Sequence, residues 1–337
     1  MLYQLKQCVW EVTLSCCFSC KYCGSRAGDR RKNELSTSEC RDVAAQLAIQ
    51  GCERVSLIGG EVFMRPDWTQ IVSFLRTFGM RVTIITNGYL FTDILIHQIK
   101  EAGVESVAVS LDGLEPLHDQ FRQPGSFRRA DEAIDRLSKG GILVSIISTL
   151  NSENVLELEE FYQYLLTKRI FAWQLQACCP MGNARHASVN HIFDHAKVIQ
   201  FVNSHIWNAP FSIGVADNIG YYTSEEGFIR GNLSGKAVYP GCQAGIHTIG
   251  IDSVGNVRGC ESMYDERFNE GNLRERRLKD IWEDPNSFSY NRKFKLEMLA
   301  GKCSDCPHGD ICRGGCRSYN YFTHGNLYTS PTCAHIQ

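Results

Sequence analysis

The chain has 337 residues, enough for one large domain and a smaller one. It carries 35 Lys and Arg residues against 37 Asp and Glu residues, a formal net charge of -2, so these totals give no electrostatic reason to expect a nucleic acid or an acidic membrane as partner. The longest apolar run, residues 141–150, is too short to span a bilayer, and Lys6 and Glu11 interrupt the apolar residues near the amino terminus. We therefore expect a cytoplasmic protein.

Short β-branched runs alternate with amphipathic segments along the first half of the chain. The first of these segments begins at a Ser or Thr N-cap and has Glu39 placed for a capping box. The runs predict strands at residues 8–14, 54–60, 81–88, 106–113, 142–150 and 172–177. The amphipathic segments predict helices at residues 36–50, 66–78, 92–103, 126–141 and 153–168.

This alternation favours a parallel sheet, and six β/α units fit an open or partial TIM-like barrel better than a closed eightfold one. Functional loops of such a barrel follow the carboxyl ends of the strands. After residue 180 the pattern changes to one further helix at residues 194–207 and then to Gly-rich and Cys-rich text. Two alternating runs at residues 247–260 predict a β-hairpin.

We therefore predict an α/β fold in two parts. Residues 1–235 form a partial (β/α)6 barrel domain with a bridging helix. Residues 236–337 form a small Cys-rich domain, whose cysteines replace the hydrophobic core that it lacks.

Sixteen cysteines are hard to explain as disulfides in a reducing compartment, so metal-binding or catalytic thiolates are the better interpretation. Four of them lie within residues 16–23, and seven lie in the last hundred residues. The scattered remainder is predicted to consist of small core hydrophobes: Cys8, Cys40, Cys52, Cys178 and Cys179.

The front group reads CCFSCKYC, in which Cys16, Cys20 and Cys23 have the spacing C-x3-C-x2-C. Three thiolates on one tight loop can hold three irons of a 4Fe-4S cube and leave the fourth iron open to a substrate or cofactor. The alternative is a zinc or ordinary ferredoxin site with Cys17 as the fourth ligand. Adjacent side chains such as Cys16 and Cys17 rarely converge on one ion, which disfavours that alternative.

This loop resembles the signature of radical S-adenosylmethionine (SAM) enzymes, including an aromatic residue, Tyr22, just before the third cysteine. The resemblance implies a reduced cluster that cleaves SAM to a 5'-deoxyadenosyl radical, which abstracts a substrate hydrogen. The protein then supplies a cavity that excludes water and oxygen and orients one C–H bond.

Three other segments resemble SAM-binding motifs of the same family. SLIGGE is similar to its glycine-glycine-glutamate motif, although Val62 stands where Pro is usual, and SLDG and HDQFR resemble its other contacts. The resemblance implies that Gly59, Gly60 and Glu61 bind the methionine amino group and that Ser110 and either Arg122 or Arg129 bind its carboxylate. The alternatives are that Ser110 is an ordinary strand end and that the arginines are solvated.

The seven cysteines of the tail match the SPASM pattern found in a subset of radical SAM enzymes. The tail alone also fits zinc, because its C-x2-C spacing is ribbon-like. The resemblance implies two auxiliary 4Fe-4S clusters and hence three clusters in all, one held by Cys303, Cys306, Cys312 and Cys333 and the other by Cys242, Cys260 and Cys316. The second is one ligand short, since Thr248 and its neighbours stand where some relatives place an extra cysteine. The fourth iron of this cluster is therefore either open or bound by a water or a non-cysteine ligand.

Enzymes with this architecture mostly modify peptides or proteins. Sulfatase maturases carry an Asp after the second tail cysteine as a proposed base, and Glu261 stands there in this chain, as a candidate catalytic base or as a solvated or cluster-adjacent carboxylate. The stretches at residues 23–40 and 57–68 resemble maturases of ribosomally made peptides whose precursors have nitrogen-fixation-protein-like leaders. Some of these excise tyramine at a Tyr-Gly site and leave an α-keto-β-amino amide.

We therefore expect a peptide maturase that leans toward this splicing reaction. The alternatives are cross-linking, epimerisation, sulfatase-maturase-like oxidation, a radical enzyme acting on a small molecule, and a non-catalytic electron carrier. Only fifteen residues precede Cys16, so we expect a separate small leader-binding protein to deliver the precursor. The other expected partner is an external electron donor, a flavodoxin or ferredoxin.

Overall fold

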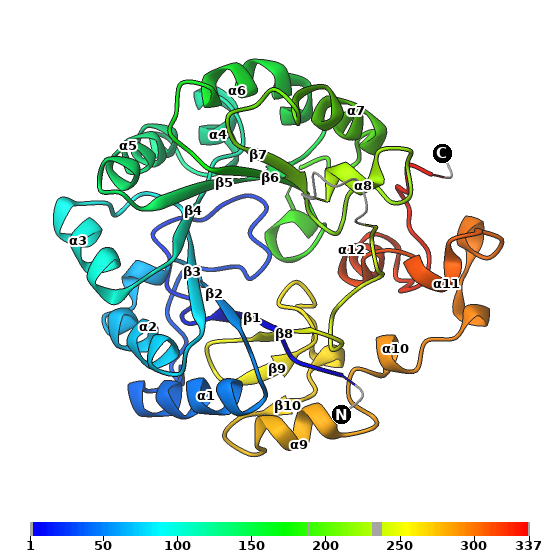
Figure 1. The fold of residues 1–337 in the computed structure, drawn as a ribbon, viewed down its shortest axis with the longest axis horizontal. Helices are drawn as coiled ribbons and strands as arrows, with labels where there is room; N and C mark the ends of the chain where they lie inside the picture. Colours follow the sequence, from blue (N-terminus) through cyan, green and yellow to red (C-terminus); the bar gives the residue numbers. More distant parts are fainter. Residues whose placement is uncertain (1–2, 188, 231–237, 336–337) are drawn as a thin grey trace.

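The computed structural model describes residues 3–187, 189–230 and 238–335, and in them the strands form one sheet that curves into an open arc with helices outside it (Figure 1). The strand order is β10-β9-β8-β1-β2-β3-β4-β5-β6-β7. The strands are β1 (Gln7–Glu11), β2 (Arg54–Ile58), β3 (Arg81–Thr86), β4 (Ser106–Ser110), β5 (Leu143–Leu150), β6 (Ala172–Ala177), β7 (Ser212–Val215), β8 (Thr248–Ile251), β9 (Asn256–Arg258) and β10 (Gly271–Asn272).

The helices of the barrel follow its strands in alternation, and shorter helices accompany the Cys-rich segment. The helices are α1 (Thr37–Ile49), α2 (Trp68–Thr77), α3 (Asp93–Ala102), α4 (Glu115–Phe121), α5 (Ser126–Lys139), α6 (Leu158–Leu165), α7 (His195–His205), α8 (Glu226–Ile229), α9 (Leu278–Glu283), α10 (Ser289–Arg292), α11 (Gly309–Cys312) and α12 (Arg317–His324).

The predicted α/β partial barrel and its hairpin are confirmed. The six expected strands are β1 to β6, and each pairs in parallel with the next. Helix α1 begins after the N-cap Ser36, and Glu39 completes the capping box as expected. The expected hairpin is the antiparallel pair β8 and β9.

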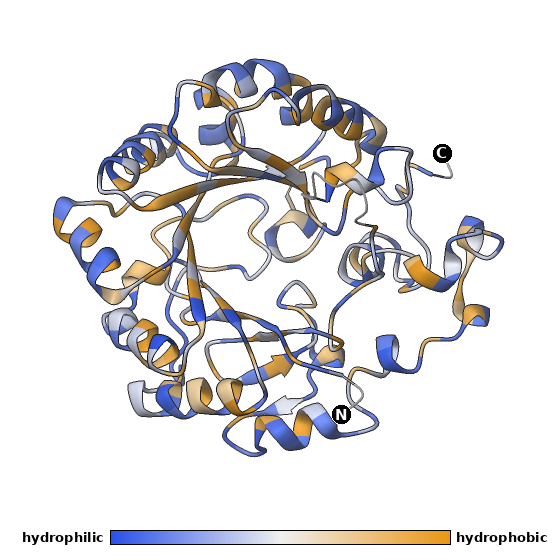
Figure 2. Ribbon diagram, in the orientation of Figure 1, coloured by the Kyte–Doolittle hydropathy of each residue, from blue (hydrophilic) through white to orange (hydrophobic). Residues whose placement is uncertain are grey.

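The sheet has an outer face that packs against the helices and an inner face that borders a cavity. Every second residue along these strands is buried in the hydrophobic core, as Cys8 and Trp10 are in β1 and Val55 and Leu57 are in β2. Figure 2 shows apolar residues along the strands and polar residues on the outer surfaces of the helices. Since side chains alternate across a strand, the intervening residues face the barrel interior.

Two features of the sheet were not predicted. Strand β7, in the short segment SIGV with a glycine at its centre, extends the parallel sheet beyond β6. Strand β8 pairs in parallel with β1, so the Cys-rich segment continues the barrel sheet on its other side. The predicted domain boundary between residues 235 and 236 lies outside the described residues and stays a prediction.

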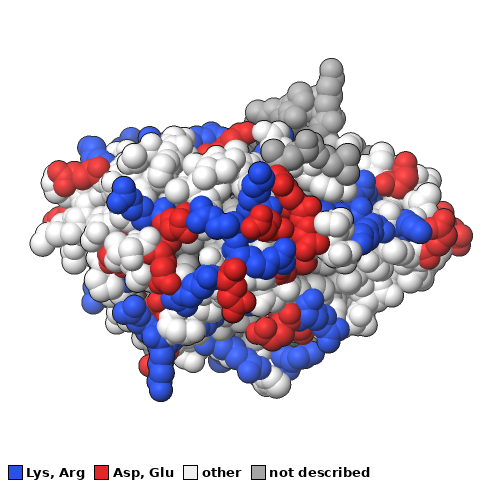
Figure 3. Space-filling view, turned by 90° about the horizontal axis from the view of Figure 1, so that it is seen from below, with Lys and Arg blue, Asp and Glu red and all other residues white. Residues whose placement is uncertain are grey.

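The outer surface carries charged side chains of both signs (Figure 3). Within the part of the chain that the structure describes, no helix is both long and apolar enough to cross a membrane. Figure 3 views the molecule from below, and there basic and acidic side chains are interspersed. Ion pairs such as Arg274–Glu39 and Arg276–Asp284 accompany this mixed charge.

Candidate active site

A cavity of about 510 Å3 lies at the carboxyl ends of the barrel strands. Its wall includes Ser110 at the end of β4, Thr149 near the end of β5 and Ala177 at the end of β6. The loop between β1 and α1 and parts of the Cys-rich segment complete the lining. The volume lies within the range typical of small-molecule and cofactor sites.

The loop after β1 brings Cys16, Cys20 and Cys23 to this cavity. Its two ends are joined by backbone hydrogen bonds, because the Cys16 N–H donates to the Gly28 carbonyl at 2.8 Å and the Gly28 N–H donates to the Leu14 carbonyl at 3.1 Å. The loop therefore closes on itself and presents its three thiols from a fixed base.

The sulfur environment of this loop fits an iron–sulfur cluster. The Phe18 and Ala27 N–H groups donate to the sulfurs of Cys16 and Cys23 at 3.4 and 3.3 Å, and such hydrogen bonds tune cluster thiolates. Burial raises the pKa of Cys20 to about 11, so a bound metal would be what holds that thiolate at neutral pH. The described residues contain no three His, Cys, Asp or Glu side chains placed to hold a single ion. A cubane distributes its protein ligands over separate irons.

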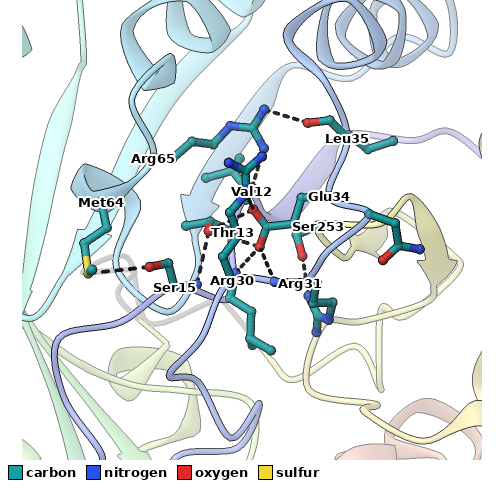
Figure 4. A network of polar contacts seen from close by, with 12 residues as sticks. Val12, Thr13, Ser15, Arg30, Arg31, Glu34, Leu35, Met64, Arg65 and Ser253 are labelled. Atoms are coloured by element: carbon teal, nitrogen blue, oxygen red, sulfur yellow. Dashed lines mark hydrogen bonds and ion pairs between the residues drawn. The ribbon is translucent and has the colours of Figure 1, made fainter.

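A buried carboxylate, Glu34, fixes the return of the loop (Figure 4). It accepts hydrogen bonds from the Thr13 hydroxyl at 3.0 Å, the Leu14 N–H at 2.7 Å and the Arg30 side chain at 3.1 Å. Arg31, beside it, donates to Ser253 of the Cys-rich segment. The same network therefore ties the cysteine loop to β1 and to the carboxyl-terminal part of the chain.

The two glycines after β2, Gly59 and Gly60, allow the backbone at the end of β2 to lie against the backbone of the loop after β1. The Gly60 N–H donates to the Thr13 carbonyl at 2.7 Å. A Cβ at Gly60 would lie 2.2 Å from the carbonyl oxygen of Ser15, and one at Gly59 would lie 2.6 Å from that of Thr13. Both glycines also line the cavity. Their absence of side chains is thus required by packing, whatever else their backbone binds.

Glu61 lies behind the cavity wall rather than on it. Its carboxylate accepts hydrogen bonds from the Thr86 hydroxyl at 2.9 Å and the Asn87 N–H at 2.8 Å. Burial raises its pKa to about 7. In this arrangement the side chain joins the ends of β2 and β3, and the expected contact of Glu61 with the cofactor stays a prediction.

The two candidate arginines occupy different environments. Arg122 lines the cavity, and its guanidinium pairs with the buried Asp112. Arg129 lies on α5 with 56% of its side chain exposed, in an ion pair with Glu132. Ser110 lines the cavity on the same side as Arg122. The geometry favours Arg122 of the two as the carboxylate-binding residue.

Asp112 organises this corner of the cavity. It accepts hydrogen bonds from the Tyr22 hydroxyl, from Arg122 and from the Thr149 N–H. Burial acts to raise its pKa, but Arg122 and these hydrogen bonds hold the pKa below its ordinary value. Tyr22, the aromatic residue of the loop, is thereby held beneath the Arg122 guanidinium, which lies 5.4 Å from its ring centre.

We predict that Arg122→Met weakens SAM binding about tenfold or more, because hydrogen bonds to charged groups contribute about 1.5–3 kcal/mol. Arg129→Met is the matched control and leaves the affinity unchanged, since that side chain is largely exposed and is not part of the cavity lining. Equilibrium dialysis of SAM against the reconstituted proteins measures both, with thermal unfolding to confirm that each variant folds. Equal losses in the two variants would contradict this assignment.

The tail cysteines lie at two places. Cys242, Cys260 and Cys316 line the main cavity together with the loop cysteines. A second, small cavity is lined by Cys303, Cys306, Cys312 and Cys333 together with Tyr221, Tyr222 and His335. Tyr221 lies between the two groups, because its hydroxyl accepts a hydrogen bond from the Cys316 N–H at 3.0 Å. The assignment of cluster ligands stays a prediction.

Sequence reasoning missed several residues of the cavity wall. Cys178 and Cys179 follow β6 directly, and both line the cavity. Cys178 also lies in a buried apolar cluster, as expected, whereas Cys179 is only partly buried. Glu11 at the end of β1 lines it too. Their position at the carboxyl ends of strands was the available signal.

Glu261, the candidate base, lies in the cavity wall and is 8% exposed. Neither of its carboxylate oxygens has a hydrogen-bond partner among the described residues. Burial, followed by the negative charge of Glu11, raises its pKa well above the ordinary value. Burial therefore disfavours the charged form of this carboxyl group, and a nearby positive or hydrogen-bond-donating group would favour that form.

The fold and the site define a class of enzyme. The radical SAM superfamily model matches residues 10–165, and the SPASM iron–sulfur cluster-binding domain model matches residues 242–307. The chain belongs to the radical SAM superfamily, in the subset that carries a SPASM domain. It is a radical SAM enzyme that uses SAM and iron–sulfur clusters.

Relatives with different names match nearly the whole chain. The chain is 30% identical over 330 residues to the mycofactocin maturase MftC of Mycolicibacterium smegmatis, covering 93% of this chain and 78% of that protein. It is 28% identical over 341 residues to the AdoMet-dependent heme synthase of Oleidesulfovibrio alaskensis, covering 97% and 86%.

Among solved structures, SuiB of Streptococcus suis bound to S-adenosylmethionine superposes with a TM-score of 0.79 at 17% identity, over 98% of this chain and 78% of that one. SuiB has also been solved bound to its precursor peptide SuiA. At this identity the likeness concerns the fold.

Proposed function

We propose that this chain is a peptide maturase, a radical SAM/SPASM enzyme that abstracts a hydrogen from a ribosomally made precursor peptide. The observation that carries the proposal is that one cavity is lined both by Cys16, Cys20 and Cys23 and by Cys242, Cys260 and Cys316. The kinship to a maturase and the shared fold with SuiB, which has been solved with a precursor peptide, support the same conclusion.

When bound, the cluster and SAM supply the electron and the 5'-deoxyadenosyl radical. In this proposal Arg122 and Ser110 bind the carboxylate of SAM, and the backbone at Gly59 and Gly60 binds its amino group; all four residues line the cavity. Thr149 belongs to the wall from which a substrate would be oriented.

The proposed reaction is excision of tyramine at a Tyr-Gly site of a precursor with a nitrogen-fixation-protein-like leader, leaving an α-keto-β-amino amide. The proposal includes three 4Fe-4S clusters, Glu261 as a catalytic residue, a flavodoxin or ferredoxin as electron donor, a separate small leader-binding protein and a cytoplasmic location. It rests on the resemblance of the segments at residues 23–40 and 57–68.

Anaerobic co-expression of this protein with a co-encoded small precursor tests the reaction. We expect the peptide to lose the atoms of a tyrosine residue without its carbonyl group, a mass two hydrogens below that of free tyramine, and we expect the loss to disappear when Cys16, Cys20 and Cys23 are replaced by Ala. A loss of two hydrogens would replace splicing by cross-linking or oxidation. An unchanged mass together with no deuterium uptake from solvent would contradict the peptide proposal.

The kinship to heme synthases supports a second candidate, a small-molecule substrate. The same cavity volume of about 510 Å3 could hold such a substrate in place of a peptide segment. The two candidates differ in what the enzyme requires for turnover: production of 5'-deoxyadenosine rises on addition of the precursor peptide in one case and of an iron porphyrin in the other.

A further inference from the structure

Two buried carboxyl groups meet at one wall of the main cavity. Glu11 ends β1 and is 1% exposed, and Glu261 follows β9 and is 8% exposed. Both line the cavity. One oxygen of Glu11 and both oxygens of Glu261 have no hydrogen-bond partner among the described residues. Buried polar groups are normally paired, so three unsatisfied oxygens at one wall require an explanation.

The local fold places Glu261 beside the inner face of β1. Gly250 of β8 pairs with Val9 of β1, which is two residues before Glu11 and faces the cavity like it. A Cβ at Gly250 would lie 2.4 Å from the backbone nitrogen of Glu261. The glycine therefore admits the Cys260–Glu261 backbone against β8, and this brings the two carboxyl groups to the same region of the barrel.

One carboxylate oxygen of Glu11 accepts hydrogen bonds, and the other has no partner among the described residues. Arg31 donates to Glu11 Oε1, to the Ser253 hydroxyl (Figure 4) and to the Tyr264 hydroxyl. The Ser253 N–H donates to the same Glu11 oxygen at 3.3 Å. Glu11 Oε2 is buried and has no hydrogen-bond partner among the described residues, in a side chain that belongs to the cavity lining.

The nearby cations are already committed to other carboxylates. Arg31 pairs with Glu11, and Arg258 pairs with Asp252 at 3.1 Å and lies over the Tyr264 ring. Arg258 retains two N–H groups without a partner, but its bond to Asp252 and its contact with Tyr264 hold it in place. Glu261 is thus a third carboxyl group with no cation of its own, and an isolated buried carboxylate is unfavourable.

We propose that Glu11 and Glu261 form a binding site for a positively charged N–H donor of the substrate, an alkylammonium or guanidinium group. Such a group can satisfy the three unpaired oxygens at once with charge-assisted hydrogen bonds. The inference rests on the proposed peptide substrate, which can supply this group from a lysine, an arginine or an α-amine. The site then fixes the position of the peptide relative to the cysteine loop.

The test uses small probes and needs no turnover. Anaerobic calorimetry on the reconstituted holoprotein compares N-acetyl-lysine N-methylamide, N-acetyl-arginine N-methylamide and norleucine N-methylamide, which carries a free α-ammonium, with the neutral N-acetyl-norleucine N-methylamide. We expect at least one charged probe to bind about tenfold or more tightly than the neutral one, since a charge-assisted hydrogen bond contributes about 1.5–3 kcal/mol. The preferred probe identifies the source of the cation.

Glu11→Gln and Glu261→Gln are each expected to remove this preference and bring the charged probe to the affinity of the neutral one. Glu270→Gln is the matched control, because Glu270 is a part-buried carboxyl outside the cavity lining. Thermal unfolding and iron content confirm that the variants fold and retain their clusters. Equal binding of charged and neutral probes, or a preference that survives both substitutions, would overturn the proposal. Probe binding without any reaction of a peptide would instead count against the proposed function alone.

Discussion

Replacement of Cys16, Cys20 and Cys23 by Ala is expected to reduce 5'-deoxyadenosine formation to the level of a protein-free control. The three thiols line the cavity on one loop, and with their removal the cluster that activates SAM has no protein ligand. If all three proposed clusters are present in the parent protein, the iron content falls by about a third, because each 4Fe-4S cluster holds the same number of irons. Anaerobic reaction with dithionite and SAM, followed by chromatography and iron analysis, measures both quantities.

Cys17→Ala is the matched control for this experiment. Cys17 is adjacent to Cys16, but it is absent from the cavity lining, and its sulfur lies 3.5 Å from the Asn87 amide. We expect this variant to keep its iron and its production of 5'-deoxyadenosine. A loss as large as that of the triple variant would restore Cys17 as a ligand and contradict the three-cysteine interpretation.

Gly60→Ala is expected to destabilise the fold by about 3 kcal/mol or more, because a Cβ there would overlap backbone that has no room to move. The added atom would lie 2.2 Å from the Ser15 carbonyl oxygen and 2.5 Å from that of Leu14. Relief of this overlap displaces the cysteine loop from the end of β2, so cluster retention falls as well. Chemical denaturation and iron content measure the two effects.

Gly28→Ala provides the comparison within the same loop. A Cβ at Gly28 would meet no heavy atom within 4 Å, although its backbone closes the loop through hydrogen bonds to Cys16 and Leu14. We expect little change in stability and full iron content for this variant. If both substitutions had equal effects, the close approach of β2 to the loop would not be what positions the cysteines.

Much of the fold could be predicted because local pattern and tertiary structure agree. The period-two alternation of β1 to β6 reflects helices on one face and a cavity on the other, and the capping box at Ser36 and Glu39 is a purely local signal. Strand β7 escaped because its four residues with a central glycine give no periodic pattern. The pairing of β8 with β1 depends on residues some 240 positions apart, which no local signal records.

The candidate site divides in the same way. The cysteine loop and the tail cysteines were visible as spacings, and the structure brings Cys16, Cys20 and Cys23 to the same cavity as Cys242, Cys260 and Cys316. Partners that depend on packing were not visible. Asp112 beneath Arg122, the carboxyl of Glu11 and the two cysteines after β6 became apparent only when strand ends were placed around one cavity.

The central claim is that a peptide hydrogen is abstracted in this cavity. The most direct measurement is the mass of 5'-deoxyadenosine released in an anaerobic reaction of the reconstituted protein, SAM and a reductant with a precursor peptide deuterated at its carbon-bound positions. We expect deuterium to appear in the 5'-deoxyadenosine, and we expect no such product with the variant lacking Cys16, Cys20 and Cys23. Unlabelled 5'-deoxyadenosine, formed at the same rate with or without the peptide, would contradict it.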